Sequence, residues 1–197
     1  MYGWHLKILR VNLTTREIKQ EDVDPKIARD YLGGRGWAIH YMYKEMNPAA
    51  DPLSPENMLI FATGPLTATP WMKRTGFDLF IFEGRASVPV YVLVNEDQIE
   101  IRSAAHVWGK DTHETTDILK AETSTEARVA CIGPAGENLA LMAAIMNDKH
   151  RAAARSGVGA VMGSKNLKAV VAMGNKNPAL HNPEAMRSIS VETSKHV

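Results

Sequence analysis

The amino-acid sequence predicts an α+β domain with antiparallel or mixed β-sheets. Short apolar segments with strand character recur along the 197 residues, and hairpins or short loops join most of them. Helical patterns do not alternate regularly with these segments, which argues against a doubly wound parallel sheet. The length suits one domain with a hydrophobic core, or at most two small ones.

The first residues have the pattern of two paired strands. Apolar residues occupy every second position of a half-buried strand, with a slip at Leu9. These apolar positions are Trp4, Leu6, Ile8, Val11 and Leu13. Residues 12–17 supply turn-forming side chains, so residues 18–23 can return as a second strand.

Two helices are expected next. Asp24 suits the N-cap of a helix, and Pro25 suits its first position. This helix stops at the two glycines of residues 33–34, because glycine favours a helix end. A second helix is expected over residues 37–46, before Pro48.

The rest of the chain is richest in strands. Continuous apolar runs predict strands over residues 58–62, 78–82, 90–94, 127–133 and 167–173. The run at 90–94 turns through residues 95–97 into a further strand over 99–102, which is a strong hairpin signal. Helices are expected over residues 112–122 and 183–191, whereas residues 139–146 fit neither period securely.

The charge pattern favours no polyanionic partner. The chain has 23 Lys and Arg against 22 Asp and Glu, a formal net charge of +1, and the two signs are interspersed. Neither nucleic acid nor an anionic membrane is therefore an expected partner. No segment approaches the roughly 20 apolar residues of a membrane span, and the first residues lack the pattern of a signal peptide. We expect a cytoplasmic protein.

Few residues have the spacing of a catalytic site. The single cysteine, Cys131, excludes an intramolecular disulfide and a Cys-only metal site within this chain. Its apolar surroundings favour a packed, unreactive thiol over a nucleophile. The seven histidines lack the i, i+4 pairing of a helical zinc site. Neither a Gly-x-Ser-x-Gly elbow nor a phosphate-binding P-loop motif is present.

Two glycine-containing loops are candidates for ligand binding. In residues 31–36, Gly34 and Gly36 permit close approach of the backbone to a ligand, and Arg35 can meet a phosphate. The alternative is a helix end with one exposed arginine. In residues 132–139, Asn138 and exposed backbone N–H groups can hold polar ligand atoms, and the alternative is a tight turn.

A third loop, residues 147–168, combines cations with small residues. Arg151 and Arg155 precede a helix that we expect to start near Gly157, and Gly159 follows. Small residues let the backbone approach an anion, so the segment is interpreted as an anion cradle. The glycine spacing also imitates a dinucleotide fingerprint. That alternative is weak, because no apolar strand directly precedes the glycines and no acidic residue follows at the required distance.

Six segments, in order along the chain, together resemble the tungsten-dependent aldehyde:ferredoxin oxidoreductase family. They are residues 4–15, 31–36, 53–67, 76–84, 132–138 and 157–169. The resemblance implies a β-rich domain of two sheets, the base on which a tungsten (or molybdenum) bis-pterin cofactor lies. It also implies a magnesium ion that bridges the pterin phosphates.

The resemblance also implies which residues contact the cofactor. Arg151 and Ala152 match the positions nearest the magnesium-bridged phosphates, and the backbone carbonyl of Ala152 matches a magnesium ligand. Arg155 and Gly157 match positions close by. The remaining expected cofactor-binding residues are Gly34, Arg35, Gly36, Asn138 and Gly159. Pterin dithiolenes hold the metal in this family, so no protein thiolate is required.

Two departures from the family pattern are expected to matter. Members of the family carry a further stretch of a few dozen residues, here missing after Pro70, with an arginine and an asparagine near the cofactor. Lys73 and Arg74 do not replace them and are expected to form an exposed helix end. We therefore expect a pterin-base domain over residues 1–175 with an internal deletion, and residues 176–197 as a tail or the start of the missing helical region. Longer relatives also ligate a 4Fe-4S cluster, which this chain cannot do with one cysteine.

By resemblance, the activity is oxidation of aldehydes to carboxylic acids with ferredoxin as electron acceptor, and this domain binds the cofactor. The expected partners are ferredoxin or a ferredoxin-like subunit, and a separate chain that carries the helical domains. Two alternatives remain open. The chain is a non-catalytic pterin-binding or interaction subunit, or it is an inactive truncated remnant.

Overall fold

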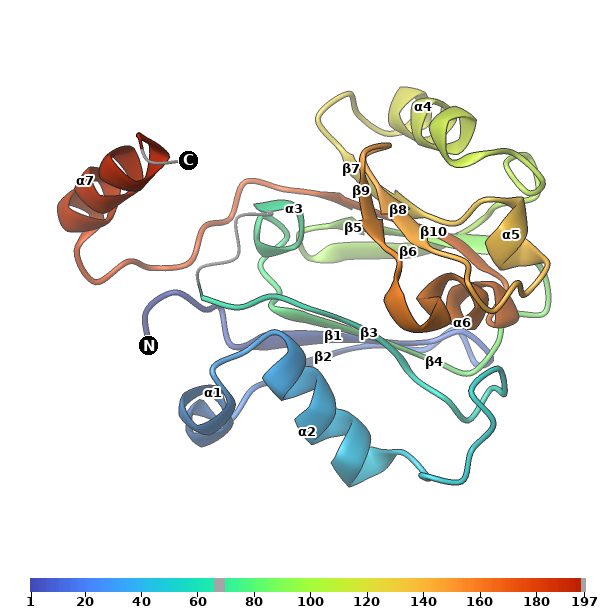
Figure 1. The fold of residues 1–197 in the computed structure, drawn as a ribbon, viewed down its shortest axis with the longest axis horizontal. Coiled ribbons are helices and arrows are strands. Elements are labelled where there is room, and N and C mark those ends of the chain that lie inside the picture. The colour runs from blue at the N-terminus through green and yellow to red at the C-terminus, as the bar shows by residue number, and fades with distance from the viewer. Residues whose placement is uncertain (66–69, 196–197) are drawn as a thin grey trace.

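A computed structural model describes residues 1–65 and 70–195, and it consists of two mixed β-sheets enclosed by helices (Figure 1). The fold confirms the α+β class with two sheets. Residues 66–69, just before Pro70, lie outside the described residues, as does the end of the 53–67 segment.

The first sheet has the strand order β2-β1-β4-β3. Its strands are β1 (Lys7–Asn12), β2 (Ile18–Asp22), β3 (Leu59–Ala62) and β4 (Leu79–Glu83). Strands β1 and β4 are parallel, and the other neighbours are antiparallel. Helices α1 (Pro25–Tyr31) and α2 (Arg35–Glu45) cover its outer face. The carboxylate of Asp24 accepts the Lys26 N–H and confirms the expected N-cap.

The slip expected at Leu9 is wrong. Ile8 contacts the core under α1 and α2, and Leu9 contacts the core between the sheets, so β1 is regular and buried on both faces. The irregularity lies at Leu6, whose φ of 59° is left-handed. The buried Asp78 carboxylate accepts the backbone N–H groups of His5 and Leu6 at 2.7 and 2.8 Å. This tie keeps residues 5 and 6 out of the strand.

The second sheet has the strand order β6-β5-β10-β7-β8-β9. Its strands are β5 (Val90–Asn95), β6 (Gln98–Ser103), β7 (Arg128–Cys131), β8 (Ile145–Asn147), β9 (Arg151–Ala153) and β10 (Leu167–Met173). Only β5 and β10 are parallel among these neighbours. Helix α4 (Thr112–Glu122) covers the outer face (Figure 1). Two short helices, α5 (Pro134–Glu137) and α6 (Val158–Ser164), lie beside the sheet, and the turn η1 (Arg155–Gly157) leads into α6.

The main core lies between the two sheets. Alternate residues of each central strand enter it, as Phe80 and Phe82 of β4 and Val92 of β5 do, while Leu79 and Ile81 face the helices. Because both faces of the sheets are covered, the central strands have continuous apolar runs rather than alternating ones.

Cys131 is buried in the second sheet, and burial raises the pKa of its thiol to about 11. The packed thiol is confirmed. Near the other end of the chain, α7 (Pro183–Ser194) has no buried residue and stands apart from the sheets in Figure 1. Among the described residues, no helix has the length and apolar content needed to cross a membrane.

The expectation that Lys73 is exposed is wrong. Lys73 ends α3 (Pro70–Lys73), and its ammonium is buried, where it donates to the Gly3 carbonyl at 2.5 Å and to that of Pro65 at 3.3 Å. Burial lowers the pKa of Lys73, and the nearby Asp78 carboxylate acts in the opposite direction. The side chain therefore holds α3 against residue 3 and against the chain that ends at Pro65. Arg74 is exposed, as expected.

A second buried lysine connects three of the segments that carry the family resemblance. The Lys165 ammonium, fully buried, donates to the carbonyl oxygens of Asn57 and Gly84 at 2.5 and 3.1 Å. Burial is the main cause that lowers the pKa of Lys165 to about 8, and the Glu83 carboxylate partly opposes it.

We predict a pH-dependent contribution of Lys165 to stability. Its ordinary pKa is 10.5 and its folded pKa is about 8, so the unfolded chain binds more protons between these values. The free energy of unfolding, measured relative to Lys165→Met, should therefore rise from pH 8 to 10.5 by up to roughly 3 kcal/mol. Urea titrations of both proteins at several pH values measure it. A pH-independent difference would contradict the prediction.

Candidate functional site

Helix α6 is held by close backbone packing, which explains its glycines. A Cβ on Gly159 would lie 2.7 Å from the backbone of Ala143, and a Cβ on Gly157 would overlap the Leu141 carbonyl. The Gly159 N–H donates to the Ala143 carbonyl at 2.9 Å. Both glycines are buried. They let the helix approach the preceding loop, and the exposed residues before them remain available to a ligand.

The exposed residues of the predicted anion cradle form an edge strand and the turn after it. Arg151 and Ala152 lie in β9, and Arg155 begins η1. Within residues 1–65 and 70–195, neither arginine has a carboxylate within ion-pair distance. A helix was expected near Gly157, and α6 begins at Val158. The unpaired guanidinium groups leave this edge able to bind an anion.

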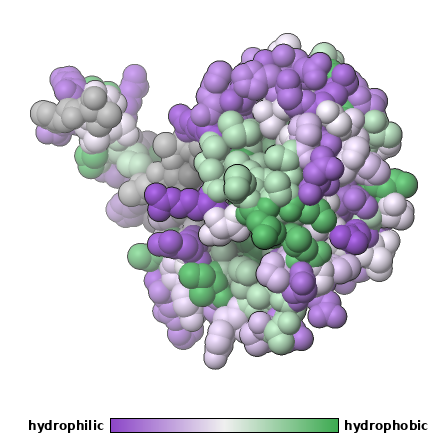
Figure 2. All heavy atoms as spheres, turned by 45° about the vertical axis from the view of Figure 1, so that its right-hand side comes forward, coloured by the Kyte–Doolittle hydropathy of each residue, from purple (hydrophilic) through white to green (hydrophobic). Residues whose placement is uncertain are grey.

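A groove of about 240 Å³ opens beside β9 and is lined by both sheets. Phe61 comes from β3 of the first sheet, and the remaining lining comes from the second. The lining residues are Phe61, Ala130, Ile145, Asn147, Arg151, Ala152 and Ala153. In Figure 2, apolar surface gathers in the middle of the face shown, below a hydrophilic region. The groove therefore combines an apolar floor with a cationic rim, a suitable shape for a flat ligand that carries phosphate.

The first glycine loop lies at the far end of β3. The Gly34 N–H donates to the Thr63 carbonyl at 2.9 Å, and Thr63 is two residues beyond Phe61, or roughly 7 Å along an extended chain. Gly34 has a φ of 54°, and a Cβ there would have only the Gly64 nitrogen near it, at 3.9 Å. At Gly36, by contrast, the Tyr31 carbonyl occupies the place that a Cβ would take. Arg35 is exposed.

Asn138 is not brought to the cationic edge by any contact among the described residues. Its side-chain amide donates to the Pro134 carbonyl at 2.8 Å and closes the turn that contains α5. The structure thus relates Gly34 and Arg35 to the groove through β3, places Arg151, Ala152 and Arg155 at the groove or next to it, and leaves Asn138 on a separate turn.

Several buried polar atoms have no hydrogen-bond partner in the described part of the chain. They include the indole nitrogens of Trp4 and Trp37, the Nε2 atoms of His5 and His40, and Asp78 Oδ1. The Trp4 nitrogen lies 3.2 Å from the position of a Cβ on Gly33. Buried groups of this kind normally bind water or a ligand. No cluster of metal-ligating side chains occurs in the described ranges.

Sequence reasoning missed several groove residues. Strand β9 has three residues, too few for a period to be visible, and its charged beginning resembles a loop. Ile145 and Asn147 lie in β8. Ile145 belongs to residues 139–146, which neither the helix nor the strand period assigned, and Asn147 is the residue after them. Phe61 was recognised as a strand residue, but its position beside β9 depends on the packing of the two sheets.

The sequence matches the family described as "Aldehyde ferredoxin oxidoreductase, N-terminal domain" over residues 8–72 and 68–174. The chain belongs to this family.

Several known proteins are similar to this chain. The tungsten-containing aldehyde ferredoxin oxidoreductase of Pyrococcus furiosus is 46% identical over 207 residues, covering 89% of this chain and 34% of the relative. The WOR-like subunit of an aliphatic sulfonate oxidoreductase from the same organism is 33% identical, covering 100% of this chain and 39% of that subunit. The chain thus spans between a third and two fifths of the length of these relatives.

Among solved structures, the active site complex BamBC of benzoyl coenzyme A reductase, in complex with 1,5-dienoyl-CoA, superposes with a TM-score of 0.93. It is 35% identical, covering 99% of this chain and 34% of that chain.

The alignment to the 46% identical relative spans 207 positions, while 89% of 197 residues is about 175. About 32 positions of the relative therefore have no counterpart in this chain.

We predict that Gly159→Ala is destabilising, because its Cβ would meet the Ala143 backbone. The expected loss in free energy of unfolding is about 2–3 kcal/mol. Gly109→Ala is the matched control, since Gly109 has a φ of +84° but nothing within 4 Å, and its backbone strain should cost about 1 kcal/mol. Urea titrations measure both. Equal losses would show that close packing at Gly159 is not the constraint.

Proposed function

We propose that this chain forms the base for a tungsten bis-pterin cofactor in an oxidoreductase of the aldehyde ferredoxin oxidoreductase family. The observation that carries the proposal is the groove beside β9, where unpaired Arg151 lines an apolar floor between the two sheets, with unpaired Arg155 four residues further along the chain in η1. This is a suitable arrangement for a flat ring system with a phosphate tail, and family membership supports the same cofactor.

The proposed roles follow from exposure and charge. Arg151 and Arg155 would hold the pterin phosphates, and the backbone carbonyl of Ala152 would be a ligand of the magnesium ion that accompanies them. Gly157 and Gly159 support this edge by letting α6 pack closely. At the first loop, the open side of Gly34 and the exposed Arg35 reach other polar atoms of the cofactor, and Gly36 lets the loop close. Asn138 is proposed to reach it from the second loop.

The bound cofactor supplies the two-electron oxidation of an aldehyde to a carboxylic acid, with tungsten, or molybdenum, as the redox metal. This chain contributes binding and orientation. It contains one cysteine, so a 4Fe-4S cluster and the transfer of electrons to ferredoxin belong to another polypeptide or another part of the protein.

We propose a separate partner chain that carries the helical domains, in a cytoplasmic assembly. Two similar proteins support a multi-subunit arrangement by their descriptions, one as a subunit and one as a BamBC complex. We also propose that residues 1–175 are the pterin-base domain, shortened after Pro70, and that residues 176–197 belong to the following region. The family match over 8–174 and the roughly 32 unmatched positions support these bounds.

A second candidate function is a non-catalytic pterin-binding subunit. The single cysteine favours it, because the redox relay is then supplied elsewhere. The third alternative is an inactive remnant.

Anaerobic purification followed by elemental analysis separates these functions. Stoichiometric tungsten or molybdenum without iron would support the pterin-binding module, and a folded chain free of both metals would contradict the cofactor proposal.

We predict that removing the cationic edge weakens phosphate binding. Arg151→Ala combined with Arg155→Ala should lower the affinity for inorganic pyrophosphate by roughly tenfold or more, since each charge-assisted hydrogen bond contributes about 1.5–3 kcal/mol before solvent screening. Calorimetric titration measures the change. Arg29→Ala, an exposed arginine of α1, is the control and should bind as the unmodified chain does. Equal affinities for all three proteins would place the site elsewhere.

A further inference from the structure

The hairpin that carries the cationic edge has little support from its own sheet. Strands β8 and β9 have three residues each, β8 pairs with β7 at two positions, and β9 is the outermost strand. Short hairpins are marginally stable by themselves. Contacts outside the strand ladder must therefore fix the position of Arg151.

The turn of this hairpin, residues 148–150, makes such contacts at every residue. Asp148 has a left-handed φ of 46°. Its carboxylate accepts the Val129 N–H at 3.2 Å and an Arg128 N–H at 3.3 Å, and it lies 3.7 Å from the Lys120 ammonium. Its own N–H donates to the Val129 carbonyl at 2.9 Å. Both β7 and α4 therefore hold the first residue of the turn.

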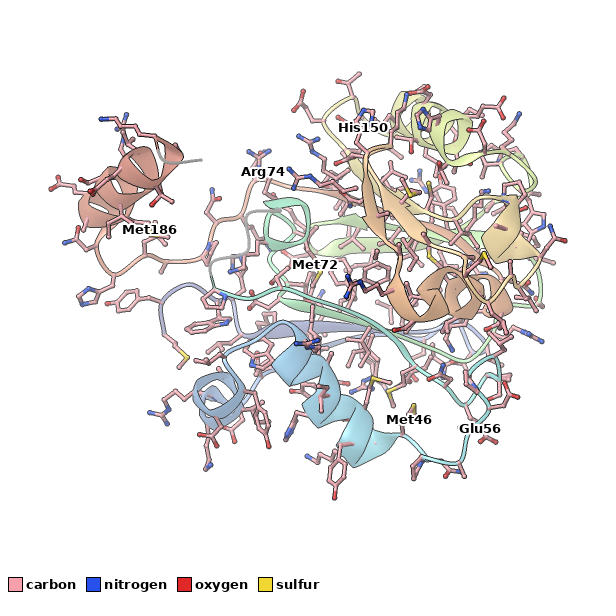
Figure 3. The ribbon with its side chains drawn as sticks, viewed as in Figure 1. Met46, Glu56, Met72, Arg74, His150 and Met186 are labelled. Atoms are coloured by element: carbon pink, nitrogen blue, oxygen red, sulfur yellow. The ribbon has the colours of Figure 1, made fainter. Side chains whose placement is uncertain are left out.

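The side chains of the next two residues of the turn contact α4. The Lys149 ammonium lies 2.5 Å from Asp117 Oδ1. The His150 ring meets the His113 ring edge-to-face, with centroids 6.1 Å apart, and Figure 3 shows His150 at the tip of the hairpin, next to α4. His113, Asp117 and Lys120 follow an i, i+4, i+7 spacing, so they share one face of the helix.

We propose that His113, Asp117 and Lys120 of α4 are positioning residues that clamp the β8–β9 hairpin and so fix the anion-binding edge at Arg151. This clamp rests on the proposed function for its purpose, because an anion site needs its cations in a fixed geometry. None of the three side chains lines the groove. They act through the turn, not on the ligand.

Because Asp117 is negatively charged, the direction in which its removal changes the affinity for an anion tests the clamp. Removing a carboxylate near a cationic site should strengthen anion binding if only Coulomb attraction matters. The clamp requires the opposite result, since Asp117→Ala frees Lys149 and loosens the hairpin. Because Asp117 is mostly exposed, its ion pair corresponds to roughly a 1.5-fold to fivefold change in an equilibrium constant.

Two measurements on the full chain test the clamp. Asp117→Ala should weaken pyrophosphate binding by about 1.5-fold to fivefold and speed amide hydrogen exchange over residues 145–155 by a similar factor. Glu114→Ala removes the same charge from α4, where the Glu114 carboxylate lies 3.9 Å from the Lys110 ammonium of the same face, and it should leave the exchange unchanged. The double variant Asp117→Lys, Lys149→Asp should restore slow exchange.

Equal exchange in Asp117→Ala and Glu114→Ala, or tighter pyrophosphate binding by Asp117→Ala, would overturn the clamp. If Asp117→Ala does not fold, Lys149→Met tests the same ion pair from the hairpin, and unchanged exchange there would also overturn it. If the unmodified chain does not bind pyrophosphate but Asp117→Ala exchanges faster over 145–155, the clamp stands and the proposed function fails.

Discussion

The site depends on the close approach of the α6 backbone to residues 136–143. Backbone atoms of that segment occupy the space that a Cβ would need at three glycines, Gly157, Gly159 and Gly163. Larger residues would push α6 away from Gly136 and Ala143, and they would move the turn that carries Arg155. The glycines of the third loop are therefore a packing requirement first. Their consequence for a ligand is indirect, because they fix where the exposed cations lie.

The second requirement is that the two sheets pack face to face, because this packing brings distant parts of the sequence into one groove. Phe61 belongs to an edge strand of the first sheet, and Arg151 to an edge strand of the second. Buried Lys73 donates to the carbonyls of Gly3 and Pro65 and so holds α3 against both the first residues and the chain beyond β3.

Local signals were sufficient to predict much of the fold. The cap at Asp24, the hairpin turn at 95–97 and the helix over 112–122 depend on nearby residues, and the structure contains all three. Long-range contacts decided the features that were missed. The tie of Asp78 to residues 5 and 6 moved the start of β1, and β9 forms only because β8 is beside it. The anion cradle was predicted from charge and glycine content, whereas its apolar floor required the packing of both sheets.

The most direct test of the central claim is to map where a phosphate-bearing ligand binds. Amide chemical shifts of the isotope-labelled chain, followed by NMR as pyrophosphate is added, report the location without assuming any residue role. We predict that the largest changes occur at residues 151–157, with smaller changes along β3 toward Gly34. Changes confined to residues away from both edge strands, or no changes at saturating pyrophosphate, would contradict it.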